Sequence, residues 1–194
     1  MIFGNPSKFA IQMDVVKAWS SPPTFIEGVV NVYLNDVLLG EGYAYTSSIF
    51  QDYIDIVDGV LANPSVVSEE EFSSDVALIL PEILKARHPW LVFDSDVDYE
   101  SAPDELWSNT DEDLSKDATF ETLLKKGYKL FAIKCKEAVR LMVLRFDLAD
   151  GGYFDLSELN YADIQEVVVG AEYLSDLVEC IDKWYQFVQG VCEK

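Results

Sequence analysis

Residues 30–38 read VNVYLNDVL, and this stretch sets the expected fold. Val30, Val32 and Leu34 alternate with polar or amphipathic residues, which is the period-two pattern of a half-buried strand. Asn35-Asp36 follows as a tight-turn signal. We therefore predict an antiparallel hairpin whose second strand covers about residues 38–45.

The preceding residues extend this hairpin into a meander. Apolar side chains alternate with small or polar ones from Phe9 to Val15, which predicts one more strand. Ser20-Ser21-Pro22-Pro23 supplies the turn residues of the connection between that strand and the hairpin.

The pattern then changes to a helical period. Apolar residues predict a helix that ends at Asn63-Pro64, with this stripe: Ile49, Phe50, Tyr53, Ile56, Val57 and Val60. A second helix is expected from Ser68, because Glu71 stands three residues later and can complete a capping box. Pro81 is expected to break or kink that helix before Ile83-Leu84.

The second half predicts a further hairpin and a long final helix. Strands are expected over residues 130–135, 139–146 and 164–169, and a sharp break is expected at residues 150–152. The final helix should cover residues 172–189 with an apolar stripe: Leu174, Leu177, Val178, Ile181, Trp184 and Val188. The expected fold is a single α+β domain over residues 1–194, with helices packed on an antiparallel sheet and an amphipathic C-terminal helix.

Acidic residues dominate the charge. The chain has 35 Asp and Glu against 14 Lys and Arg, which gives a formal net charge of −21. Nucleic acids and anionic membranes are bound through Lys and Arg, so we expect neither as a partner. A basic protein is the natural complement.

Sequence features also predict a cytoplasmic location. No run of about 18 apolar residues could cross a membrane, and the N-terminal residues lack the basic start and apolar core of a secretory signal. The three cysteines form no CxxC pair and are odd in number: Cys135, Cys180 and Cys192. We interpret them as small apolar residues in a reducing compartment.

Catalytic motifs are sparse in this sequence. His88 is the only histidine, and no GxSxG nucleophile elbow accompanies it. Neither GxxxxGK[ST] nor GxGxxG is present. We predict that the chain is not an enzyme and needs no cofactor.

A calcium site is considered because four acidic residues occupy positions 1, 3, 5 and 12 of an EF-hand loop: Asp94, Asp96, Asp98 and Glu105. Tyr99 stands where the loop needs Gly for a sharp turn, and Pro103 lies where the exit helix should begin. Residues 147–158 lose ligands at Ala149 and Gly151. We therefore predict no metal site.

The acidic residues are concentrated in one loop-rich segment, at about residues 89–120. Nine of them fall between Asp94 and Asp113, and no Lys or Arg occurs from residue 88 to 115. Aromatic residues interleaved with charge are typical of a docking surface, because buried aromatics supply binding energy and charges steer the encounter. The candidate partner-binding residues are Asp94, Asp96, Asp98, Tyr99, Glu100, Asp104, Glu105, Trp107, Asp111, Glu112 and Asp113.

The start of the chain resembles a known family. Residues 2–6 (IFGNP), residues 8–12 (KFAIQ) and Trp19 are similar to the opening of immunity protein family forty-two, from bacterial polymorphic-toxin and contact-dependent growth inhibition systems. The Asn35-Asp36 turn, the acidic aromatic segment and the later strand pair follow in the family's order. Asp36 departs from the Gly that family members tend to have there.

The resemblance implies a non-enzymatic cytoplasmic inhibitor that binds and neutralises a cognate toxin domain. Many such toxins are nucleases, whose basic clefts an acidic protein can occupy. An acidic secretion chaperone or adaptor that binds a basic client protein is the alternative, and a carboxylate-dependent hydrolase comes third. The sequence leaves open which toxin is bound, whether its active site or another surface is contacted, and the oligomeric state.

Overall fold

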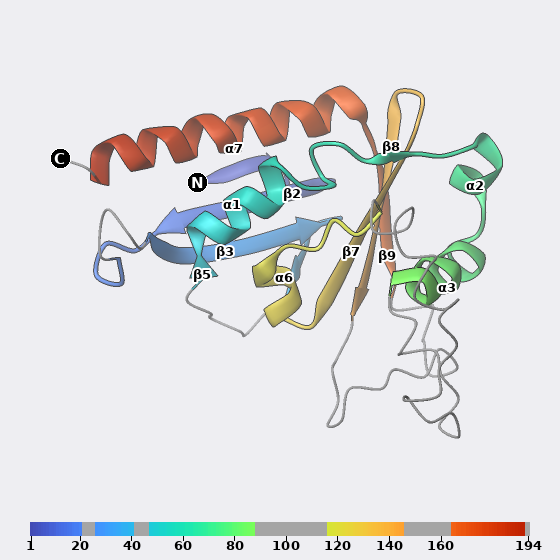
Figure 1. The fold of residues 1–194 in the computed structure, drawn as a ribbon, viewed down its shortest axis with the longest axis horizontal. Coiled ribbons are helices and arrows are strands. Elements are labelled where there is room, and N and C mark those ends of the chain that lie inside the picture. Colours follow the sequence, from blue (N-terminus) through green and yellow to red (C-terminus); the bar gives the residue numbers. More distant parts are fainter. Residues whose placement is uncertain (21–25, 41–46, 88–115, 146–163, 193–194) are drawn as a thin grey trace, which may run out of the picture.

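The computed structural model describes residues 1–20, 26–40, 47–87, 116–145 and 164–192. In these ranges the chain forms two β-sheets with helices around them, a mixed α+β architecture that confirms the predicted fold class. The strands of the second sheet run steeply across those of the first (Figure 1).

The first sheet is an antiparallel meander. Its strand order is β1-β2-β3-β4, and β5 also pairs with β3. The bounds are β1 Ile2–Asn5, β2 Phe9–Val15, β3 Glu27–Leu34, β4 Val37–Leu39 and β5 Ser47–Ser48. Buried and half-buried residues alternate along the whole of β3, as the period-two pattern predicted.

The turn between β3 and β4 confirms the hairpin. Asn35 and Asp36 have φ angles of 50° and 65°, which are the two left-handed positions of a type I′ turn. Asp36 adopts this conformation without being Gly, and its backbone N–H donates to Pro6 O at 2.8 Å. β4 covers Val37–Leu39, and residues 41–45 of the predicted strand lie outside the described residues.

The second sheet has the order β6-β7-β8-β9. Its bounds are β6 Ser65–Val66, β7 Tyr128–Cys135, β8 Ala138–Arg145 and β9 Gln165–Gly170. The β7-β8 hairpin and β9 confirm the predicted strands, and β6 adds a parallel pair with β7. We predicted one sheet, and the structure has two, because the apolar β7-β8 hairpin is covered on both faces and forms a sheet of its own.

The central hairpin of the second sheet is buried on both faces. Leu130 and Leu141 face the larger core cluster, which also contains residues of the first sheet, α1, α6 and α7. Phe131 and Met142 face a second cluster that α3 covers. A continuous apolar run such as residues 141–144 indicates a strand covered on both faces.

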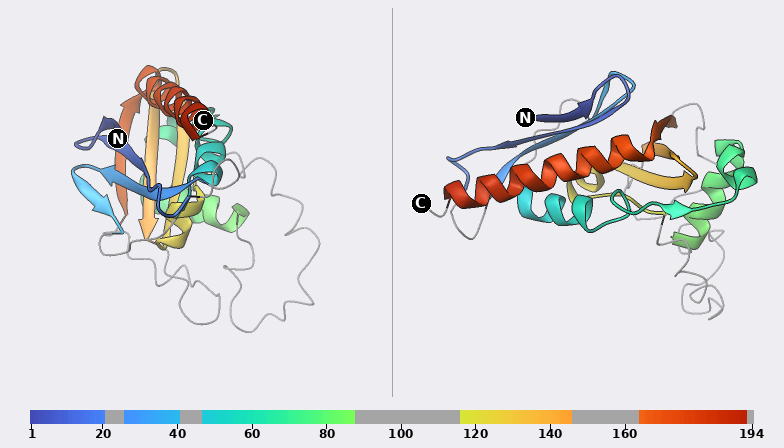
Figure 2. Two further views of the ribbon diagram at one scale, coloured as in Figure 1. Left: turned by 90° about the vertical axis from the view of Figure 1, so that its left-hand side faces the viewer. Right: turned by 90° about the horizontal axis from the view of Figure 1, so that it is seen from above.

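Five helices occur within the described residues. They are α1 Ile49–Val57, α2 Glu69–Ser73, α3 Val76–Arg87, α6 Glu121–Lys125 and α7 Ala171–Cys192. α7 lies between the β1 edge of the first sheet and α1 (Figure 2). The predicted C-terminal helix is thus confirmed, and its apolar stripe lies in or against the larger core cluster.

Two helix predictions were wrong. The first helix ends at Val57 rather than near Asn63, and Phe50 is 48% exposed although we placed it on the buried stripe. The break allowed for at Pro81 does not occur, because Pro81 lies inside α3, which continues to Arg87. The break between helices occurs earlier, where the Asp75 carboxylate accepts a hydrogen bond from Ala77 N at 2.8 Å and begins α3.

Ser68 is the N-cap of α2, as predicted, and its hydroxyl accepts from Glu71 N at 3.1 Å. The Glu71 side chain was expected to complete the capping box. Instead its carboxylate accepts from Lys116 Nζ at 2.8 Å, so it ties α2 to the residues before β7.

A fully buried carboxylate connects the two halves of the fold. Asp52 of α1 is 0% exposed and accepts from Thr122 N at 2.8 Å and from Thr122 Oγ1 at 2.6 Å. Asp55 accepts from Glu121 N at 3.1 Å. The N-cap residue of α6, Phe120, makes no side-chain cap bond, so α1 supplies the cap that α6 lacks.

The other end of α6 carries a buried cation. Lys126 Nζ donates to Val30 O at 3.0 Å and to Asn31 Oδ1 at 2.9 Å, both on β3. Burial lowers the pKa of Lys126, and the charge of Asp52 opposes that shift. Together these bonds fix α6 against both α1 and the first sheet.

We expect Thr122→Val to destabilise the protein by about 1–3 kcal/mol, because it leaves a buried carboxylate oxygen without its hydroxyl donor. Thr122→Ser keeps the hydroxyl and should cost less than about 1 kcal/mol, the value of one methyl group. Urea unfolding of the two variants measures the difference. Equal losses would contradict the role given to the hydroxyl.

Candidate functional site

The eleven partner-binding residues predicted between Asp94 and Asp113 lie outside the described residues, as do His88 and both calcium-loop candidates. What the structure describes is how the chain is held on either side of them. A second acidic segment, residues 146–163, also lies outside the described ranges. The two segments contain nine and five acidic residues and no Lys or Arg.

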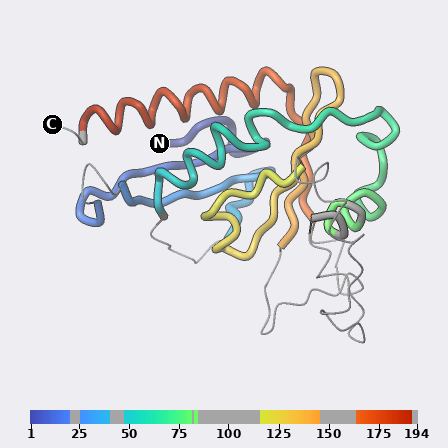
Figure 3. The backbone as a smooth tube through the Cα atoms, viewed as in Figure 1, coloured from blue at the N-terminus to red at the C-terminus, as the bar shows by residue number. Residues whose placement is uncertain are grey.

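Three of the four ends of these segments lie at the second core cluster, and the path of the chain on either side of the segments can be followed in Figure 3. Leu84, three residues before the end of α3, is buried in this cluster, and Leu144 occupies it at the end of β8. Ile164, just before β9, packs against it. The chain therefore leaves the described fold twice, and re-enters it once, beside one hydrophobic cluster.

Ion pairs fix the point where the first segment rejoins the fold. Lys116 pairs with Glu71, and Asp117 pairs with Lys129 at 3.2 Å, with both side chains of the second pair only 7% exposed. Arg140 adds a buried crosslink. It donates to Glu166 Oε2 and to the backbone oxygens of Phe72 and Ser74, so it holds β9 and the α2-α3 connection to β8.

Most of the Lys and Arg residues between positions 116 and 145 bond to acceptors within the described residues. Eight of the 14 Lys and Arg residues lie in residues 116–145. Six of these eight make ion pairs or hydrogen bonds with described acceptors: Lys116, Lys125, Lys126, Lys129, Lys136 and Arg140. Most of the cations of residues 116–145 are therefore bonded within the described fold.

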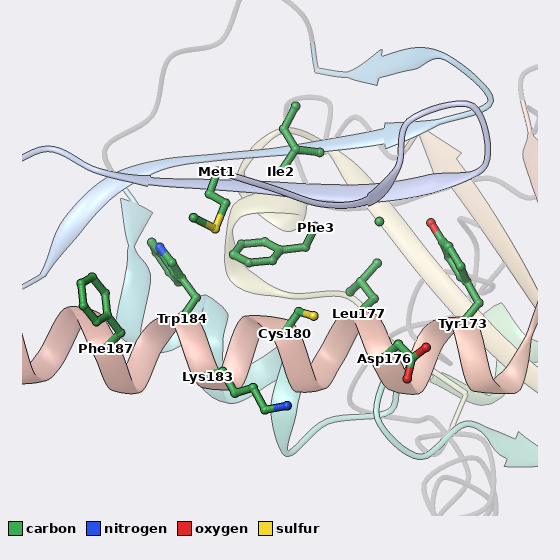
Figure 4. Close-up of a pocket in the computed structure, with 11 residues that line it drawn as sticks. Met1, Ile2, Phe3, Tyr173, Asp176, Leu177, Cys180, Lys183, Trp184 and Phe187 are labelled. Atoms are coloured by element: carbon green, nitrogen blue, oxygen red, sulfur yellow. The ribbon is translucent and has the colours of Figure 1, made fainter.

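A groove lies between β1 and α7. Its volume is about 590 Å³, and its lining is mainly apolar. Met1, just before β1, and Phe3 on β1 extend toward the helix, and Leu177 and Trp184 extend from α7 toward the strand (Figure 4). Phe3 and Trp184 meet edge to face, with ring centroids 5.7 Å apart.

Beside this groove, a tyrosine hydroxyl bridges two backbone groups of β1 and β2. Tyr173 OH accepts from Asn5 N at 2.6 Å and donates to Phe9 O. Gly4 is required here because its φ is +86° and an added Cβ would lie 2.7 Å from that hydroxyl and 2.6 Å from Phe9 O. The side chain of α7 thus holds β1 at the groove.

α7 is positioned on α1 through an aromatic stack. The Tyr53 and Tyr185 rings are stacked with centroids 3.9 Å apart, and Tyr53 OH donates to Asp182 Oδ1 at 2.7 Å. The hydrogen bond to Asp182 and burial raise the pKa of Tyr53 to about 12. These contacts fix the side of α7 that packs on α1, and the side toward β1 lines the groove.

Within the part of the chain that the structure describes, no three His, Cys, Asp or Glu side chains gather closely enough to hold a metal ion. None of the described helices is both long and apolar enough to cross a membrane. The groove and the anchored acidic segments are therefore the features to compare with known proteins.

The profile of the family Imm42, immunity protein 42, matches residues 1–185. The chain belongs to the immunity protein 42 family. The resemblance seen in residues 2–19 is thereby confirmed. No curated protein matches the chain.

A solved structure supports the fold of this Imm42 protein. The crystal structure of CdiI from Burkholderia dolosa AUO158 is similar with a TM-score of 0.64 and 21% sequence identity, over 93% of this chain and 97% of that chain. At this identity the similarity shows the fold. The family match favours an immunity protein over the secretion chaperone considered as the alternative.

Sequence reasoning did not predict the groove. It placed Trp184 on the buried stripe of the last helix and predicted no strand at residues 2–5, so the two sides of the groove were not brought together. The sequence signal for the groove was a second aromatic residue, Phe187, three residues after Trp184. In the structure Phe187 is 69% exposed.

We expect Tyr173→Phe to loosen β1, because Asn5 N and Phe9 O lose their shared partner. The loss should be about 1 kcal/mol, since the site is only partly buried. Hydrogen exchange should become faster at the Asn5 amide and stay unchanged at the Val16 amide, which donates to Glu27 O on β3. Unchanged exchange at Asn5 would contradict the role of the hydroxyl.

The raised pKa of Tyr53 gives a pH prediction. The folded protein holds the phenol neutral, so the stability from this bond is fully present below pH 10 and is lost as the pH rises through about 12. Ultraviolet titration should show one late-ionising tyrosine that Tyr53→Phe removes. Asp182→Asn should lower the pKa of Tyr53 toward 10, whereas Asp176→Asn, earlier on α7, should leave it unchanged.

Proposed function

We propose that this chain is an immunity protein of a contact-dependent growth inhibition system, which binds a cognate toxin domain in the cytoplasm and neutralises it without catalysis. The family match over residues 1–185 carries this proposal. The net charge of −21 favours a basic partner.

A nuclease is the toxin class that fits this charge best. A nuclease binds phosphates through a basic cleft, and carboxylates can occupy the positions where phosphates would lie. The segment from Asp94 to Asp113 is our proposed contact, because its nine carboxylates are accompanied by Tyr99 and Trp107. Aromatic anchors in a charged surround are the composition of a binding hot spot.

The anchoring of this segment supports its role. It leaves the fold at the second core cluster and returns at the Lys116–Glu71 ion pair, and both ends of the acidic segment 146–163 lie at the same cluster, so the 14 carboxylates of both segments are attached to the same part of the molecule. Grouped charge of one sign increases the rate at which an oppositely charged protein is captured. Fast capture matters for an inhibitor that must act before its toxin does.

Growth rescue tests the proposal directly. The toxin domain encoded beside this protein's gene should stop growth when expressed alone, and co-expression of this chain should restore growth. The purified proteins should form a stoichiometric complex that contains the folded toxin domain. Failure of both rescue and co-purification would overturn the proposal, and binding only to an unfolded or extended toxin segment would favour a chaperone.

Salt dependence tests the acidic contact. Steering should raise association with the toxin domain toward ~10^8–10^9 M⁻¹ s⁻¹ at low ionic strength, from an unsteered ~10^5–10^6 M⁻¹ s⁻¹. The triple variant Asp111→Asn, Glu112→Gln, Asp113→Asn should associate more slowly and depend less on salt. Stopped-flow mixing at several ionic strengths measures both effects.

A matched control removes the same charge elsewhere. The triple variant Glu70→Gln, Glu137→Gln, Asp58→Asn neutralises three exposed carboxylates on α2, in the β7-β8 turn and at the end of α1. It should change association less than the first variant. Equal effects would mean that net charge, and not the segment 94–113, governs the encounter.

A further inference from the structure

The groove between β1 and α7 exposes large apolar side chains to solvent. Phe187 is 69% exposed and Met1 is 61% exposed, and both gather with Trp184 at one end of the groove (Figure 4). Single exposed apolar residues are ordinary, but a concave apolar surface with exposed aromatic residues is typical of a binding site.

α7 carries more acidic than basic residues. Its four acidic residues, Glu172, Asp176, Glu179 and Asp182, stand against one base, Lys183. Asp182 bonds to Tyr53 on the α1 side, and Lys183, which also lines the groove, forms an ion pair with Glu179 one turn earlier. Asp176, which lines the groove, is exposed. An occupant must therefore be apolar where it enters the groove and basic beside it.

Charge also decides between possible occupants. A second copy of this chain would bring another acidic α7 and a further net charge of −21 to the same surface. The two long segments of this chain outside the described ranges carry nine and five acidic residues without a base. Both are repelled by the acids of α7, whereas a basic partner is attracted.

We propose that the groove is a second contact site for the toxin, which inserts an apolar side chain between β1 and α7 and places a Lys or Arg beside Asp176. This inference rests on the proposed function for the identity of the partner. It differs from the acidic contact in its energetics, because a side chain buried in the groove slows dissociation, whereas steering speeds association.

The groove site is tested with variants that preserve the fold. Phe187→Ser removes an exposed ring and should weaken binding of the purified toxin domain by about 10-fold or more, mainly through faster dissociation. Leu124→Ser removes an exposed apolar side chain of α6 that does not line the groove, and should leave the affinity unchanged. Circular dichroism melting of both variants confirms that they are folded.

Charge reversal gives a second comparison. Asp176→Lys places a cation where the partner's base is expected and should weaken binding, whereas Glu70→Lys makes the same charge change on α2 and should weaken it less. Surface plasmon resonance gives the rate constants for all four variants and for the wild type.

Cys180 provides a direct footprint, because it lines the groove and is exposed. Its reaction with a thiol reagent should slow at least ~10-fold in the toxin complex, and mass spectrometry separates it from the half-buried Cys135 on β7. If the wild type binds the toxin while Phe187→Ser binds equally well and Cys180 reacts at its free rate, the groove inference is overturned and the proposed function stands. Absence of toxin binding by the wild type overturns both.

Discussion

The buried carboxylate of Asp52 is the contact on which the arrangement of the two sheets depends. α1 follows the first sheet and α6 leads into the second, so the bonds from Thr122 to Asp52 join the two halves through one fully buried side chain. Lys126 adds donors to β3 from the other end of α6. Because a buried charge without its partners is costly, these elements hold one geometry. That geometry also sets α7, which stacks on α1 through Tyr53.

Local patterns predicted the elements that are stabilised locally. The alternation in β2 and β3, the Asn35-Asp36 turn, the β7-β8 hairpin and the stripe of α7 could all be read from neighbouring residues. α6 could not, because it has five residues and its cap comes from Asp52 and Asp55, about 70 positions away. The continuous apolar residues 141–144 did carry a signal for a sheet covered on both faces, but the prediction used them only to place a hairpin. For the groove, the decisive fact is that Tyr173 brings α7 against residues 2–5, a contact between the two ends of the sequence.

The distribution of charge connects the fold to its proposed role. The scaffold pairs most of the cations of residues 116–145 with its own acids and carbonyls, and three of the four ends of the two acidic segments lie at one hydrophobic cluster. Both acidic segments are thereby attached to the same part of the fold. On another part of the molecule, the groove of β1 and α7 offers apolar surface next to acidic residues. Charge that speeds encounter and an apolar groove that slows release are complementary ways to inhibit a basic toxin.

Hydrogen exchange across the whole chain, with and without the cognate toxin domain, tests the central claim most directly. The account predicts that amide exchange slows in peptides covering residues 94–113 when the toxin binds, while peptides from the turn between β7 and β8 exchange as in the free protein. A toxin complex that forms and neutralises the toxin while exchange in residues 94–113 stays unchanged would contradict it.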